Sequence, residues 1–198
     1  MSNKSNDAML TSRFALALSF ANAIHNKQVR NVTGVPYVSH LMSVSASVLE
    51  YGGGETEAVA ALLHDSAEDC GGKPMLEMVR AMFGDDVATI VESCTDTFSD
   101  PKPEWKPRKE IYIAHLHGAS SGAKLVAGCD KLHNLNTTIK DLRKNPSAVY
   151  WDHFNAGAAE QLWYFSACAN ALADSPVGND LQQSCLEFES ILRTRGDV

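Results

Sequence analysis

Residues 60–69 read Ala60-Ala61-Leu62-Leu63-His64-Asp65-Ser66-Ala67-Glu68-Asp69. The first four are apolar and should be buried, whereas four of the last six are ionisable. On a helix, His64 and Glu68 lie four residues apart, and so do Asp65 and Asp69, so all four should project along one side of the helix end. Carboxylates near a helix C-terminus oppose the helix dipole. We therefore expect another group to stabilise them.

A divalent cation suits this cluster, because imidazole nitrogen and carboxylate oxygen together bind first-row metals well. The absence of thiolates at this spacing disfavours a structural zinc site. Adjacent His64 and Asp65 cannot fill a coordination shell, and two other segments offer further ligands. His40 ends Pro36-Tyr37-Val38-Ser39-His40, and Asp130 interrupts an apolar helical stretch, followed by Asn134 and Thr137 on the same face. The order His40, His64-Asp65, Asp130 predicts one metal site.

Outward from this cluster, apolar residues recur at helical steps of three and four along most of the chain. Glycines and prolines separate the segments, and strand signals are almost absent. We expect an exposed loop at 98–107, which contains three prolines, and a turn at 174–178. The sequence predicts an all-α fold of eight or nine helices around one core, at 8–24, 37–49, 55–69, 74–83, 85–95, 108–117, 120–142, 149–172 and 179–195.

Composition sets limits on the class of protein. The chain has 198 residues, 44% of them hydrophobic, and a formal net charge of −7. That is the size and composition of one globular domain, and the negative charge argues against a broad nucleic-acid interface. No apolar run reaches the roughly 20 residues of a membrane span, and the N-terminus is polar. We expect a cytoplasmic protein with reduced cysteines, since the five cysteines are scattered. The motifs carry no signal of oligomeric state.

The motifs resemble the HD-domain metal-dependent phosphohydrolases, whose ligand order is His, His-Asp, then a distant Asp. Within that family they are most similar to the Rel/Spo-type (p)ppGpp hydrolase domains and stand-alone small alarmone hydrolases. The resemblance covers about 8–172, and the helix expected at 179–195 has no family motif. It rests on Pro36 to His40, Ala61 to Asp69, Phe83 to Val87 with Thr95-Asp96, Arg108-Lys109, and Ala123 to Val126 with Asp130 to Leu135.

The resemblance implies a single HD-type domain over 1–198 that uses Mn²⁺ to remove the 3′-pyrophosphate of a purine alarmone, (p)ppGpp or (p)ppApp. It assigns every part of the site. Implied metal ligands are His40, His64, Asp65 and Asp130; the implied catalytic acids are Glu68 and Asp69; and the implied substrate contacts are Arg30, Lys109, Asn134 and Thr137.

The chain departs from the family pattern at three positions. Asn31 stands where a lysine usually follows the arginine, Leu41 replaces a proline, and Asn136 replaces an arginine. Because of Asn31 and Asn136, the resemblance does not decide which purine base the substrate carries. An adenosine alarmone is therefore an alternative to the guanosine one. Either Glu68 or Asp69 could be the acid, and Asp69 could have the raised pKa that crowded carboxylates acquire. Asp69 could instead only hold a metal-binding histidine in place.

Two further functions are compatible with these motifs. One is an HD-type nucleotide phosphohydrolase, either a 5′-nucleotidase or a dNTPase-like enzyme. The other is a non-catalytic nucleotide-binding HD domain. Intact Glu68 and Asp69 argue against it, because burying extra carboxylates costs desolvation free energy and a domain that only binds has little use for them. Cations that could contact phosphate occur in three groups: Lys27 and Arg30; Lys106, Arg108 and Lys109; and Lys140, Arg143 and Lys144.

Overall fold

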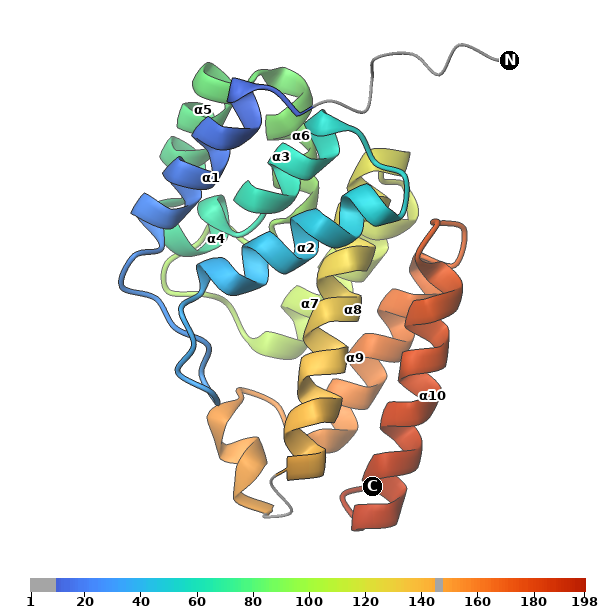
Figure 1. Ribbon diagram of the computed structural model, residues 1–198. Coiled ribbons are helices and arrows are strands. Elements are labelled where there is room, and N and C mark those ends of the chain that lie inside the picture. The colour runs from blue at the N-terminus through green and yellow to red at the C-terminus, as the bar shows by residue number, and fades with distance from the viewer. Residues whose placement is uncertain (1–9, 145–147) are drawn as a thin grey trace, which may run out of the picture.

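The computed structural model describes residues 10–144 and 148–198, which are helical apart from loops and one isolated bridge between Val29 and Pro36 (Figure 1). This confirms the predicted all-α fold. The helices are α1 (Ser12–Ile24), α2 (Val38–Glu50), α3 (Glu55–Leu63), α4 (Ser66–Cys70), α5 (Gly72–Phe83), α6 (Asp85–Cys94), α7 (Trp105–His117), α8 (Ser121–Lys144), a 3₁₀ segment (Ala148–His153), α9 (Ala158–Ala171) and α10 (Gly178–Arg195).

Helix α3 lies at the centre of the N-terminal half. Its residues from Ala58 to Leu63 are all buried, so no face of this half of the helix is left for solvent. It packs against α1, α2, α6 and α8. The chain therefore delivers His64, the residue that follows α3, to the interior of the molecule.

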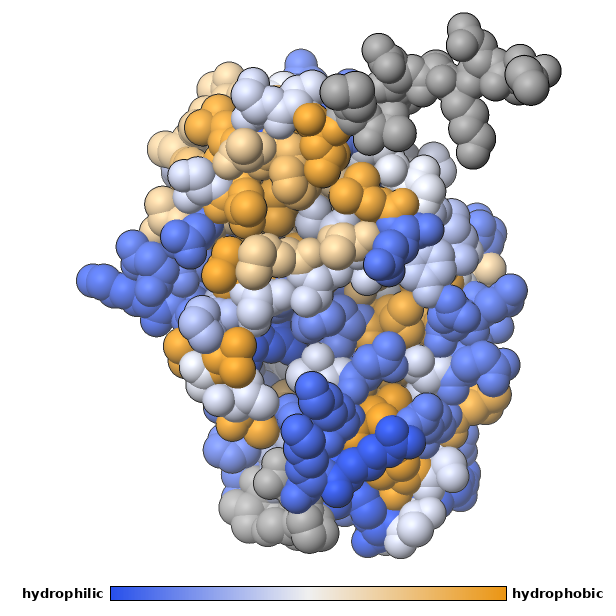
Figure 2. All heavy atoms as spheres, viewed as in Figure 1, coloured by the Kyte–Doolittle hydropathy of each residue, from blue (hydrophilic) through white to orange (hydrophobic). Residues whose placement is uncertain are grey.

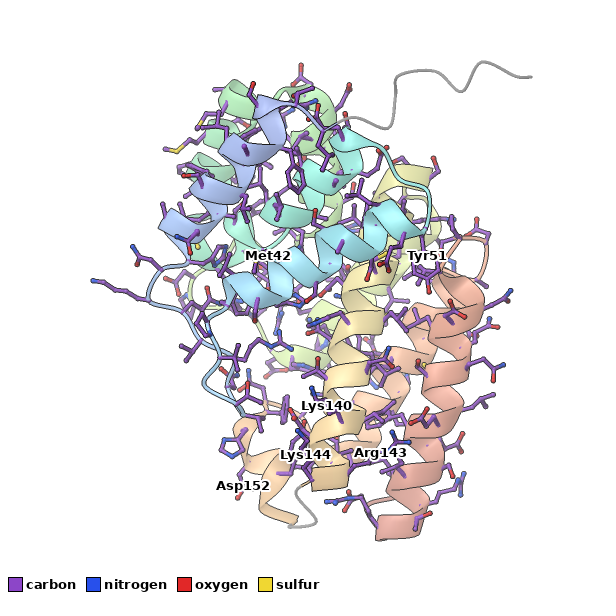
Figure 3. The ribbon with its side chains drawn as sticks, viewed as in Figure 1. Met42, Tyr51, Lys140, Arg143, Lys144 and Asp152 are labelled. Carbon is purple, nitrogen blue, oxygen red and sulfur yellow. The ribbon has the colours of Figure 1, made fainter. Side chains whose placement is uncertain are left out.

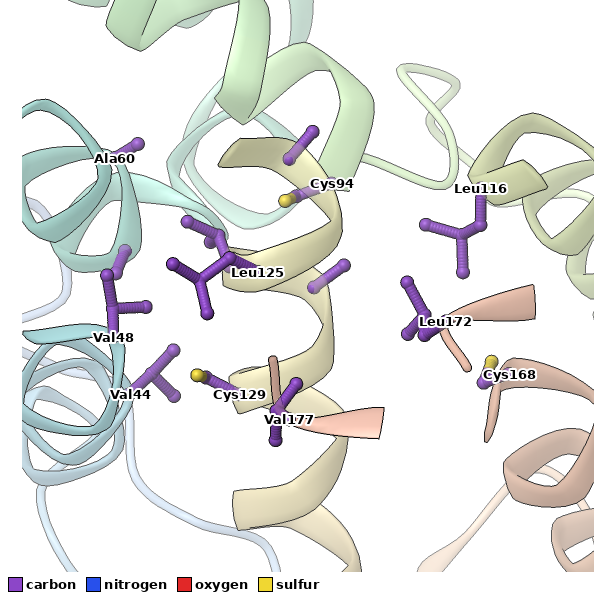
Figure 4. Packing of buried hydrophobic residues seen from close by; sticks show 14 of the residues in the cluster. Val44, Val48, Ala60, Cys94, Leu116, Leu125, Cys129, Cys168, Leu172 and Val177 are labelled. Atoms are coloured by element: carbon purple, nitrogen blue, oxygen red, sulfur yellow. The ribbon is translucent and has the colours of Figure 1, made fainter. Parts of the chain in front are cut away.

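Helix α8 joins the two halves of the molecule. It packs against α2, α3 and α6 in the upper half and against α9 and α10 in the lower half (Figure 1). Figure 4 shows the buried side chains around α8, with Leu125 and Cys129 of α8 beside Val44 of α2. Gly128 allows α8 to approach the turn before α10, because a Cβ there would lie 2.3 Å from Cγ1 of Val177. The buried apolar core extends from Ala17 in α1 to Leu192 in α10.

Two segments that the sequence predicts as single helices are each divided in the structure. The segment 55–69 is divided into α3 and α4, since Nδ1 of His64 lies 2.8 Å from the carbonyl oxygen of Ala61 and satisfies a carbonyl at the end of α3. The segment 149–172 is divided because Asn155 and Gly157 interrupt it, and Gly157 takes extended backbone just before α9. In addition, α7 begins at Trp105 rather than 108, because a helix tolerates Pro107 in its first turn.

The face in Figure 2 is mostly apolar over its upper part and mostly hydrophilic, with smaller apolar patches, over its lower part, where α8 and α10 lie. Within 10–144 and 148–198, none of the helices combines the length and apolar composition needed to cross a membrane.

Candidate metal centre and substrate cleft

Three separate elements bring the four predicted metal ligands together. His40 comes from the first turn of α2, His64 and Asp65 from the α3–α4 junction, and Asp130 from the middle of α8. Nε2 of His40 lies 3.1 Å from Oδ1 of Asp130 and 3.7 Å from Oδ2 of Asp65. Nε2 of His64 lies 3.0 Å from Oδ2 of Asp65 and 3.5 Å from Oδ1 of Asp130. Two imidazole nitrogens thus face two carboxylates across one small space.

The protonation of the two histidines follows from the atoms around them. Nδ1 of His64 donates to the Ala61 carbonyl, which directs Nε2 toward the carboxylates. Nδ1 of His40 lies 2.8 Å from Nδ1 of His133, so one of these two rings donates to the other. Burial and the neighbouring His40 and Arg30 lower the pKa of His133 to about 4, so His133 is neutral and its Nδ1 can accept the hydrogen bond from Nδ1–H of His40. Burial opposes a charge on His64, but Asp65 and Asp130 raise the pKa of His64 well above its usual value, so its Nε2 holds a proton that a bound metal ion would displace.

The carboxylates are held ionised. Burial opposes the charge of Asp130, but Lys131 at 2.6 Å and the two histidines keep the pKa of Asp130 well below its usual range. Asn134 donates to Oδ1 of Asp130 over 2.6 Å, and the Tyr37 hydroxyl donates to Oδ2 of Asp65 over 2.6 Å. These bonds fix the direction in which each carboxylate points.

The donor set fits a divalent metal ion. The Nε2 atoms of His40 and His64 are buried, and neither has a hydrogen bond of good geometry within the described residues. Ligand atoms of His40, His64 and Asp65 lie within 4.8 Å of one another. Buried polar atoms are rarely left unpaired, and a metal ion shared by imidazole and carboxylate would satisfy all of them.

The metal-ligand cluster opens into a cleft of about 460 Å³. All four predicted substrate contacts line it, as do Asn31 and both predicted catalytic acids. Asp65 and Asp130 form part of its wall, while His40 and His64 lie buried behind them. The sequence-predicted residues in the lining are Arg30, Asn31, Asp65, Glu68, Asp69, Lys109, Asp130, Asn134 and Thr137.

The two predicted catalytic acids are held at the wall by a lysine from the proline-rich loop. Nζ of Lys102 lies 2.7 Å from Oε1 of Glu68 and 3.1 Å from Oδ1 of Asp69. Gln28 donates to the other oxygen of Asp69 over 2.9 Å. Burial, helped by the negative charges of Asp96 and Asp65, raises the pKa of Glu68, and Lys102 opposes the rise. Glu68 is therefore a carboxyl prepared to hold a proton.

The candidate phosphate-binding cations divide into those that reach the cleft and those that do not. Arg30 donates to Asn134 over 2.8 Å, and Lys109 donates to Asp96 over 2.5 Å, and both line the cleft. Arg108 is buried and also pairs with Asp96. The three cations Lys140, Arg143 and Lys144 lie on the lower part of α8 (Figure 3) and are not part of the lining.

Sequence reasoning missed three residues of this site. Tyr37 and Lys131 sit beside predicted ligands within the quoted motifs, and that adjacency was the available signal. Lys102 had no signal, because the loop at 98–107 was expected to be exposed and no local pattern shows that it folds back onto Glu68.

Comparisons with known proteins agree with this geometry. The model of the HD domain family matches residues 17–155. The chain is 36% identical over 189 residues to guanosine-3′,5′-bis(diphosphate) 3′-pyrophosphohydrolase MESH1 of Drosophila melanogaster, covering 94% of this chain and 96% of that protein. It is 39% identical over 132 residues to MESH1 of Xenopus tropicalis, covering 65% of this chain and 68% of that one.

A solved structure is also similar to this chain over almost its whole length. It is described as a metazoan ortholog of SpoT that hydrolyses ppGpp and plays a role in starvation responses. It superposes with a TM-score of 0.71 at 27% identity and covers 96% of this chain and 99% of its own. With the family model spanning most of the chain and the His, His-Asp, Asp order assembled in space, the chain belongs to the HD domain family.

Proposed function

We propose that this protein is a Mn²⁺-dependent hydrolase that removes the 3′-pyrophosphate of a purine alarmone and leaves a 5′-nucleotide. The observation that carries the proposal is the pair of buried, unpartnered Nε2 atoms facing two carboxylates at one end of a cleft. The printed names of the similar MESH1 proteins support the choice of reaction.

His40, His64, Asp65 and Asp130 would hold the ion. A divalent ion bound there supplies Lewis acidity, which polarises a phosphoryl oxygen and acidifies water. The protein's own residues must hold these ligands in place and move protons. Tyr37, Lys131 and Asn134 orient the two ligand carboxylates through the bonds described above.

Glu68 is the proton-transfer group in this proposal, because its pKa is raised toward the range in which a carboxyl can both hold and release a proton. Asp69 shares Lys102 with Glu68 and is fixed by Gln28, so it orients water beside Glu68. Arg30 and Lys109 can neutralise phosphate charge, and Asn134 and Thr137 face the nucleoside.

The test is to incubate the Mn²⁺-loaded protein with ppGpp and with ppApp and to separate the products by ion-exchange chromatography. We expect pyrophosphate and the nucleoside 5′-diphosphate. Release of orthophosphate would instead indicate the nucleotidase class, and binding without turnover would indicate a non-catalytic domain.

A further inference from the structure

Helix α8 carries a line of polar side chains from the metal centre to the far end of the cleft. Asp130, Asn134, Thr137 and Asp141 are separated by four, three and four residues, which places them on one face of a helix. All four line the cleft. Asp141 lies about 16 Å beyond Asp130 along the helix axis, given a rise of 1.5 Å per residue.

Asp141 differs from every other carboxylate in the lining. Asp65, Glu68, Asp69 and Asp130 each accept a hydrogen bond from a described side chain. Asp141 is only 7% exposed, and no described residue donates a hydrogen bond to its carboxylate or forms an ion pair with it. The oxygens of Asp141 are not among the fully buried, unpartnered atoms of the described residues, so they are open to the cleft. A free pair of acceptors on the cleft wall fits a ligand that supplies donors.

Aromatic side chains surround this end of the cleft. Tyr150 and Trp151 come from the 3₁₀ segment and Phe154 follows it, with Tyr150 lying 5.1 Å from the Trp151 ring and 5.3 Å from the Phe154 ring, centroid to centroid. Burial, to which the negative charge of Asp141 adds, raises the pKa of Tyr150 to about 12. Flat apolar rings beside a buried acceptor form a suitable pocket for a nucleobase, which presents two faces to stack and one edge of polar groups.

The arrangement of donors distinguishes the purines at this acceptor. Guanine presents two adjacent donors, N1–H and the 2-amino group, which match the two oxygens of a carboxylate. Adenine presents the N1 acceptor at the equivalent place, and this lone pair would face a negative charge. We propose, on the basis of the function proposed above, that Asp141 contacts the N1 and 2-amino edge of guanine and makes the enzyme select a guanosine alarmone over an adenosine one.

The first test measures binding of the product nucleotides by calorimetry. GDP has both donors, IDP keeps N1–H but lacks the 2-amino group, and ADP has neither. We expect wild-type protein to bind GDP more tightly than IDP and IDP more tightly than ADP, with about 10- to 100-fold between GDP and ADP. Equal affinities for the three, or a preference for ADP, would overturn the proposal.

The second test compares Asp141→Asn with wild type. The amide has the same shape but replaces one acceptor by a donor, so the GDP preference should fall to within about threefold and the ratio of kcat/KM for ppGpp to that for ppApp should fall about 10- to 100-fold. Asp152→Asn is the matched control. It changes an exposed acid on the 3₁₀ segment, labelled in Figure 3, that is not part of the cleft lining, and it should keep both ratios.

An unchanged ratio in Asp141→Asn, or an equal loss on both nucleotides, would contradict the assignment. Thermal melting checks that the variant folds, and Asp141→Ser provides a second substitution with the same expectation. If wild type releases no pyrophosphate from either alarmone, the proposed function fails, whereas the GDP, IDP and ADP series still decides the role of Asp141.

Discussion

Each end of the cleft carries an aspartate of α8, and the surroundings of the two carboxylates differ. Asp130, at the metal end, contacts Lys131, Asn134 and His40, all within 3.1 Å. Asp141, on the same face of α8 at the other end, has no partner within the described residues. The metal end is therefore organised before substrate arrives, while at the far end the acceptors of Asp141 are free for a ligand. Changes at the metal end should abolish chemistry, and changes at the far end should alter choice of substrate.

The largest effect is expected at the α3–α4 junction. His64→Ala or Asp65→Ala should abolish Mn²⁺ binding, measured by elemental analysis, and reduce turnover to background, because each removes a donor from the metal centre. His117→Ala, which changes an exposed histidine at the end of α7, is the control and should retain both. Full activity of either variant after chelation would refute the metal assignment.

A smaller loss is expected when the charge beside the metal centre is removed but the ligands stay. Glu68→Gln should keep bound Mn²⁺ and lower kcat by about 10²- to 10⁴-fold, the usual contribution of a proton-transfer group. Glu110→Gln, at an exposed position on α7, should leave the rate unchanged. An unaltered rate in Glu68→Gln would remove this residue from the mechanism.

A shift in pH dependence is expected from the proline-rich loop. Lys102 lowers the pKa of Glu68, so Lys102→Ala should raise that pKa and move the Glu68-dependent limb of the kcat/KM profile to higher pH. Lys124→Ala removes a lysine that pairs with Asp174 away from the cleft, and its profile should match wild type. A shift toward lower pH in Lys102→Ala would reverse our reading of this contact.

The smallest effect is expected in the loop after α1. Asn31 lines the cleft and is exposed, so Asn31→Lys should raise kcat/KM for ppGpp relative to ppApp by only a few-fold, within the range of an exposed charge contact. Asn26→Lys adds the same charge at an exposed position outside the cleft lining. If both variants change the two substrates equally, the loop attracts phosphate without selecting the purine.

The sequence predicted the all-α fold and the residues of the metal end because both leave local signals. Helical steps of apolar residues mark the helices, and His64-Asp65 follows an apolar run that had to be buried. The contacts made by Lys102 and Asp141 depend on how distant segments pack. No spacing rule places the loop at 98–107 against Glu68. In the sequence Asp141 looks like an ordinary carboxylate on a helix, and only the structure places it in one cleft with Tyr150, Trp151 and Phe154.

The division between α3 and α4 was also hidden from the sequence. On a continuous helix the side chains of the neighbours His64 and Asp65 would point about 100° apart around the axis. At the observed break, Nε2 of His64 instead lies 3.0 Å from Oδ2 of Asp65. The dipole argument changes with it, since Glu68 and Asp69 lie in the first turn of α4 rather than at the end of a longer helix.

The junction at His64 and Asp65 has a mechanical consequence. An ion held by these two neighbours, by His40 on α2 and by Asp130 on α8 would act as a cross-link between helices that are up to 90 residues apart in the chain. A species that binds the native state and not the unfolded chain adds to the free energy of unfolding by mass action. The same four side chains that prepare the reaction would thus also clamp the N-terminal helices to the long helix that crosses the molecule.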